Sequence, residues 1–132
     1  MKRVGRFVAI LFAFGACGLA DASTDVRTIT VEIEHSAFIP QQLKVGAGER
    51  VHFVLINNDP IDHEFIIGDE HIQLIHEKGT ESHHGARDGE ISVPAGQTSE
   101  TSYTFEERGE LIYGCHLPSH YRYGMKGEIR IR

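Results

Sequence analysis

The sequence predicts an all-β domain, an antiparallel β-sandwich or barrel of seven to eight short strands. Apolar and polar residues alternate along much of the chain, as in residues 28–33, which is the pattern of a half-buried strand. Glycine, proline, asparagine and aspartate separate these stretches, and residues of these types mark turns. No long stretch repeats its apolar residues every 3.6 positions, which argues against a helical fold.

The alternation places the expected strands in chain order. In residues 51–56 both sets of alternating side chains are mostly apolar, so that strand is expected to be buried on both faces. Residues 69–90 are rich in histidine, acidic residues and glycine, which predicts a long polar loop, a kind of segment that is often functional or disordered. The strands are expected at about 28–33, 41–45, 51–56, 63–67, 91–93, 98–105, 110–115 and 127–131.

Residues 1–22 are predicted to be a secretory signal peptide, which leaves one domain at residues 23–132. A basic start is followed by an apolar run at 7–14, and then by Ala20-Asp21-Ala22, which fits a cleavage site after Ala22. The run is too short to span a bilayer. Export would place the protein in the periplasm or elsewhere outside the cytoplasm. The alternative is a lipid anchor at Cys17, although Phe14 replaces the usual aliphatic residue of such a signal.

The composition of residues 23–132 excludes some partners and leaves one cysteine to explain. Ten basic and 18 acidic residues remain there, a formal charge of −8, so nucleic acid is not an expected partner. Such a charge can steer a positively charged partner. Cys115 is the only cysteine after Ala22. Because exported cysteines normally pair, a single thiol suggests burial or metal binding.

The pattern around Cys115 favours metal binding. His120 follows five positions later and Met125 five positions after that, so a loop leaving the end of a strand could gather all three side chains. Thiolate and thioether sulfur suit copper(I), and imidazole suits copper in either oxidation state. His63, between a polar turn and a predicted strand, is the best candidate for a second histidine. The alternatives are a buried thiol at Cys115, core packing at Met125 and a turn histidine at His63.

With these residues the chain resembles the cupredoxin family of plastocyanin and azurin. The likeness runs through Phe38-Ile39-Pro40, Leu43-x-Val45-x-x-Gly48-x-x-Val51-x-Phe53, Asn57-Asn58, His63, Val93-Pro94-x-Gly96, Tyr113-x-Cys115-x-x-Pro118-x-His120 and Gly124-Met125. The resemblance implies a Greek-key sandwich and one mononuclear type 1 copper ion held by His63, Cys115, His120 and Met125. Two features depart from the family: Glu64 stands where Asn or Ser is common, and the interval from cysteine to methionine is longer.

The resemblance also implies what the protein does. It would carry single electrons between redox proteins that bind transiently, and we expect it to be a monomer. Electrons would enter and leave through the edge of the His120 ring. The surface patch that contacts redox partners around it would comprise Leu117, Pro118, Tyr121 and Tyr123. The alternative function is copper sequestration or delivery outside the cytoplasm. It is motivated by the histidines of the polar loop, His71, His76, His83 and His84, which could bind a second metal or simply be solvated.

We expect no catalytic activity, because four donors would fill the coordination sphere and catalysis needs an open position. The remaining histidines are not expected to bind copper. His116 follows Cys115 directly and should point to the opposite face of the strand. His35 and His52 are expected to be ordinary strand histidines.

Overall fold

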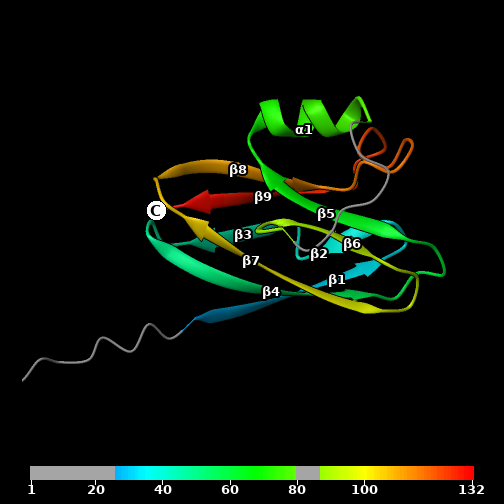
Figure 1. The fold of residues 1–132 in the computed structure, drawn as a ribbon, viewed down its shortest axis with the longest axis horizontal. Coiled ribbons are helices and arrows are strands. Elements are labelled where there is room, and N and C mark those ends of the chain that lie inside the picture. Colours follow the sequence, from blue (N-terminus) through cyan, green and yellow to red (C-terminus); the bar gives the residue numbers. More distant parts are fainter. Residues whose placement is uncertain (1–25, 80–86) are drawn as a thin grey trace, which may run out of the picture.

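The computed structural model describes residues 26–79 and 87–132, which form two β-sheets packed face to face (Figure 1). One sheet has the strand order β2-β1-β4-β7 and the other has the order β3-β9-β8-β5-β6. The first sheet comprises β1 (Arg27–Glu34), β2 (Ala37–Ile39), β4 (Glu49–Asn57) and β7 (Thr98–Phe105). The second comprises β3 (Gln42–Val45), β5 (His63–Gly68), β6 (Glu90–Val93), β8 (Gly109–Gly114) and β9 (Lys126–Ile131), and one helix, α1 (Glu70–Glu77), accompanies it.

The predicted β-sandwich is confirmed, and the structure refines its pairing. The two sheets are mixed rather than wholly antiparallel, because β1 pairs with β4 and β3 pairs with β9 in parallel. The other strand pairs are antiparallel. Alternation along a strand defines which side chains face the core but carries no information about the direction of the neighbouring strand. The sequence pattern therefore could not reveal the parallel pairs.

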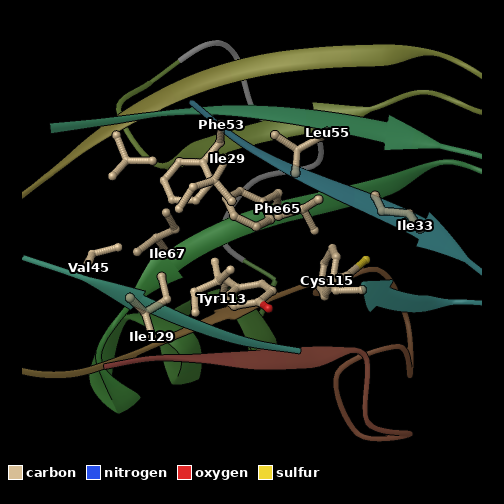
Figure 2. Packing of buried hydrophobic residues seen from close by; sticks show 14 of the residues in the cluster. Ile29, Ile33, Val45, Phe53, Leu55, Phe65, Ile67, Tyr113, Cys115 and Ile129 are labelled. Carbon is tan, nitrogen blue, oxygen red and sulfur yellow. The ribbon is translucent and has the colours of Figure 1, made fainter. Parts of the chain in front are cut away.

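Apolar side chains from both sheets meet between the layers (Figure 2). Aromatic rings form the centre of this core: the ring centroids of Phe53 and Phe65 lie 5.4 Å apart, and those of Phe65 and Tyr113 lie 5.3 Å apart. Cys115 lies at one end of the same buried cluster. The side chains of this cluster pack closely, so the end of the sandwich that carries Cys115 rests on a rigid core.

The strand that is buried on both faces is β5, and the expectation for residues 51–56 is wrong. In β4 the side chains that face away from the core, such as Val54, are only partly buried, whereas all six residues of β5 are buried. Helix α1 packs against β5 and β8 from outside the sandwich. Two glycines allow this approach: a Cβ at Gly68 would lie 2.5 Å from Ile72, and one at Gly114 would lie 3.0 Å from Oε1 of Gln73.

Part of the predicted polar loop at 69–90 is this helix, so the loop expectation is wrong for residues 70–77. Asp69 caps the helix by accepting a hydrogen bond from the backbone N–H of Ile72. Gln73 is the only fully buried residue of the helix, and its side-chain amide donates to the backbone carbonyls of Ile66 and Ile112. The helix has only two partly buried apolar residues, Ile72 and Ile75, beside Gln73, so its apolar pattern is too short to reveal it in the sequence.

Three sequence expectations fall outside the described residues. They are the signal peptide at 1–22 with its alternative at Cys17, and the loop histidines His83 and His84. The described part of the chain contains no helix with the length and apolar character needed to span a bilayer.

The fold brings distant segments together at one end of the sandwich. Strand β5 begins at His63, and β8 ends one residue before Cys115. The two strands are antiparallel neighbours with Ile66 opposite Gly114. Continuing this register places Phe65 opposite Cys115 and Glu64 opposite His116. Residues 115–125 then form the loop that leads into β9, coloured orange to red in Figure 1.

Candidate metal centre

Three of the four predicted copper ligands meet at this end of the sandwich. The Sγ atom of Cys115 lies 3.9 Å from Nδ1 of His63 and 3.3 Å from Nδ1 of His120. A metal with bonds of about 2.0 Å to nitrogen and about 2.3 Å to sulfur, set about 120° apart, would separate N and S by about 3.7 Å. Within the described residues this is the one group of three or more His, Cys, Asp or Glu side chains arranged to hold a metal ion.

Met125, the fourth predicted ligand, is buried and is tied to the same group by its backbone. Its N–H donates to the carbonyl of His120 over 3.0 Å, and its carbonyl accepts from the N–H of Cys115 over 3.2 Å. Its side chain belongs to the buried cluster that includes Cys115. The thioether therefore lies in the buried core beside these donors and not in solvent.

Hydrogen bonds and a glycine in a turn shape the loop that carries these side chains. The backbone N–H of His120 donates to Leu117, and that of Tyr123 donates to Ser119. Gly124 adopts a φ of 100°, a conformation open to glycine at little cost. The chain can therefore reverse immediately before Met125 and enter β9.

His63 is oriented by a buried carboxylate. Its Nε2–H donates to Oδ2 of Asp59 over 2.9 Å, which leaves Nδ1 with its lone pair facing the sulfur. Asp59 itself accepts backbone N–H groups from His35 and Ser36, each over 2.7 Å. A carboxylate behind a histidine in this way fixes the ring and its tautomer for metal binding.

The sequence pattern does not single out Asp59. It belongs to a polar turn, Asn57-Asn58-Asp59-Pro60, and the groups that hold it come from the turn between β1 and β2, more than 20 positions earlier. Burial alone would raise the pKa of Asp59, but the N–H groups of Ser36 and His35, together with His63, hold that pKa below its usual value. Its position four residues before His63 is the only local signal.

The pKa values of Cys115 and His63 indicate which proton a metal ion would replace. Burial raises the pKa of the Cys115 thiol to about 11, although the backbone N–H groups of Leu117 and Glu64 oppose the rise. Burial lowers the pKa of His63, with Asp59 acting in the opposite direction. At neutral pH the metal-free site thus holds a thiol and a neutral imidazole, and a metal ion must displace the thiol proton.

The donors fit copper better than a hard cation. Two imidazoles, a thiol that can ionise and a thioether offer nitrogen and sulfur, whereas magnesium and calcium prefer oxygen. The group is also only partly open to water: His63 and Cys115 are buried, and His120 is partly exposed. The arrangement can hold a soft metal ion and present one of its imidazole edges to the surface.

The histidines outside this group take other roles. His116 points away from it, as expected, and is buried under α1, where its Nε2 lies 2.7 Å from Oε1 of Gln73 and its Nδ1 lies 3.0 Å from Oε2 of Glu77. His76 packs 5.7 Å from His116, measured between ring centroids. Its Nδ1–H donates to the carbonyl of Ile72. These contacts depend on the helix and so could not be foreseen from the sequence.

Comparisons with known proteins agree with this fold. The family model for the cupredoxin-like domain matches residues 6–129. The copper-resistant cuproprotein CopI of Rubrivivax gelatinosus is 31% identical over 118 residues, which cover 85% of this chain and 70% of that protein.

Solved structures show the same fold. Auracyanin B has a TM-score of 0.66 at 19% identity, covering 80% of this chain and 88% of its own. Auracyanin A of Chloroflexus aurantiacus, described as a "blue" copper protein, has a TM-score of 0.63 at 24% identity, covering 80% of this chain and 98% of its own. From the family match over most of its length, we conclude that this chain belongs to the cupredoxin-like domain family.

Proposed function

We propose that this protein binds one copper ion through His63, Cys115, His120 and Met125 and carries single electrons between redox proteins. The observation that carries the proposal is the position of the Cys115 sulfur between two imidazole Nδ1 atoms, at 3.9 and 3.3 Å. The copper proteins among its relatives support the choice of metal. Copper, when bound, supplies a centre that accepts and releases one electron.

The residues around the site keep its geometry constant. Asp59 holds the ring of His63, and the main chain ties Met125 to both His120 and Cys115. A donor set held in place by a packed core changes little when the charge at its centre changes, which favours fast electron transfer. Cys115 provides electronic coupling into the protein, and His120 provides a partly exposed edge.

Electron partners bind transiently around His120. Tyr123 is 86% exposed there, and Ile61, in the turn that leads to His63, is 46% exposed. Pro118 is also exposed, while Leu117 and Tyr121 are partly exposed. Interfaces for electron transfer are small, so the apolar patch of a single monomer is large enough to bind a redox partner. The acidic chain favours a positively charged partner.

Export accompanies this function. The chain is secreted by the signal at residues 1–22, with cleavage after Ala22, into the periplasm or another extracytoplasmic space. Lipidation at Cys17 is the alternative. Mass spectrometry of the processed protein distinguishes the two, because cleavage after Ala22 leaves Ser23 as the first residue and lipidation leaves a modified Cys17.

The decisive experiment is copper reconstitution of residues 23–132. We expect one copper per chain, an intense thiolate-to-copper absorption band and reversible one-electron reduction. Cys115→Ser should abolish the band while circular dichroism remains that of a folded β-protein. A Cys115→Ser variant that stayed intensely coloured would show that this sulfur is not the copper ligand.

A second function, copper sequestration or delivery, is favoured by one specific observation: the relative with 31% identity is named for copper resistance. Excess copper separates the two functions. A carrier takes up one coloured, reversibly reducible ion per chain. A copper-handling protein takes up several weakly coloured ions and passes them readily to an acceptor.

The isolated protein has no turnover of its own under this proposal. His63, Cys115, His120 and Met125 would occupy the four coordination positions, which leaves no open position for a substrate. Oxidase or reductase activity of the copper-loaded protein, measured with artificial donors and acceptors, would contradict this.

A further inference from the structure

Glu64 lies directly beside the candidate copper site. It is the second residue of β5, immediately after His63, and the register of β5 with β8 places it opposite His116. Side chains alternate across a strand, so His63 and Phe65 face the core while Glu64 faces the side that α1 covers. Glu64 is nevertheless only 5% exposed, which is unusual for a carboxylate.

Glu64 contacts the cysteine segment in two ways. Its backbone N–H donates to Sγ of Cys115 over 3.3 Å. Its side-chain Oε2 accepts from the backbone N–H of His116 over 3.3 Å. The first contact is available to any residue other than proline at this position, but the second places a carboxylate against the residue that is bonded to Cys115.

We propose that Glu64 is a positioning residue whose buried carboxylate makes the site hold copper(II) in preference to copper(I), and so lowers the reduction potential of the bound copper. The inference rests on the proposed function, because it concerns the same copper. It adds the preferred oxidation state, which the four ligands do not determine.

The sign follows from electrostatics. Reduction adds one negative charge to the centre formed by the metal and the Cys115 sulfur. A nearby carboxylate repels that charge, and the repulsion is strong because a residue that is 5% exposed is poorly screened by water.

The competing explanation is that Glu64 acts only as a hydrogen-bond acceptor that fixes the backbone at His116. Glu64→Gln separates the two, because glutamine keeps the N–H to sulfur and an amide oxygen for His116 but has no charge. Glu128→Gln is the matched control, since it makes the same chemical change at an exposed position in β9.

The test is a spectroscopic redox titration of the copper-loaded wild type and both variants. We expect Glu64→Gln to raise the affinity for copper(I) relative to copper(II) roughly tenfold, an upward potential shift of about 59 mV for a one-electron couple. Glu128→Gln should leave the potential unchanged within error. Competition for copper(I) with bicinchoninate, combined with competition for copper(II) with a chelator of known affinity, should give the same tenfold change in the ratio independently.

Three further results bear on the inference. Glu64→Asn, neutral and shorter, must shift the potential in the same direction as Glu64→Gln, so the test does not depend on one variant folding well. Equal potentials in wild type and Glu64→Gln would overturn the inference while leaving the copper proposal intact. A wild-type protein that takes up no copper would overturn both.

Discussion

At the scale of single residues, the two nitrogens of His63 have separate partners. Nε2 is bonded to Asp59 and Nδ1 faces the sulfur of Cys115. Because Asp59 is held in turn by two backbone N–H groups, the imidazole is fixed before any metal arrives. A donor that is already oriented loses little conformational freedom on binding, which favours high affinity.

Asp59→Asn should weaken copper binding about 10- to 100-fold, because the residues that orient metal-bound histidines have effects of this size. Competition titration against a chelator of known affinity measures it. Asp62→Asn is the control: Asp62 is exposed in the same turn and accepts an N–H from Ala95 rather than from a histidine. Equal affinities in Asp59→Asn and wild type would show that the ring of His63 needs no carboxylate.

Met125→Leu tests the weak axial role proposed for the thioether. Leucine fills a similar buried volume, so the variant should fold and retain copper through the other three ligands. Loss of the sulfur donor should raise the reduction potential, because the axial ligand tunes it. A redox titration measures the shift, and complete loss of copper from the variant would show that the methionine is a principal ligand.

At the scale of elements, glycines set how closely neighbouring segments approach. Gly127 in β9 leaves room for the ring of Tyr113 in β8, since a Cβ there would overlap the ring and its hydroxyl group. The ring has no room to move: it is fully buried, and its hydroxyl donates to the carbonyl of Pro40. The two strands that flank the copper loop therefore depend on this glycine.

Gly127→Ala should destabilise the protein by about 1–3 kcal/mol, the usual cost of overpacking a dense core. Urea unfolding of the metal-free protein measures the change. Gly46→Ala is the control, because a Cβ at Gly46 would approach no atom more closely than 3.4 Å. If both variants unfolded at the wild-type urea concentration, the packing of Tyr113 against β9 would be looser than the structure indicates.

The elements also show what could be predicted from the sequence. Alternation is a local property, so the longer strands of both sheets were predictable from it. The three-residue β2 is too short to show alternation, and α1 buries only Gln73 completely. Helix α1 is recognisable only through its Asp69 cap and its contacts with the preceding strand β5 and with β8, which is distant in sequence.

The same reasoning applies to the site. Cys115, His120 and Met125 share one loop, so their spacing alone indicates a metal site. His63 could be proposed because a polar turn and a strand surround it. Asp59 could not, because its role depends on the backbone of Ser36 and on the orientation of a ring. Contacts made by the main chain of distant residues leave no mark on side-chain patterns.

At the scale of the whole molecule, the core extends well beyond the candidate site. Its centre consists of aromatic and aliphatic side chains from both sheets, and the candidate site occupies one end. We therefore expect the metal-free protein to fold cooperatively.

Copper should raise the melting temperature of this folded apo-protein. A ligand that binds only the folded state stabilises it by about 4 kcal/mol at 1,000 times its dissociation constant, which for a domain of this size is a rise on the order of 10 °C. Differential scanning calorimetry with and without copper measures it. An apo-protein without a cooperative transition would mean that the metal helps to build the core.

The order of the site residues along the chain has a consequence for biosynthesis. Cys115 follows His63 by 52 positions, and His120 and Met125 come later still. A nascent polypeptide cannot assemble the donor group until residue 125 has been synthesised. Metal acquisition must therefore follow synthesis of this loop, so the compartment in which the two segments fold together determines which metal ions the site first encounters.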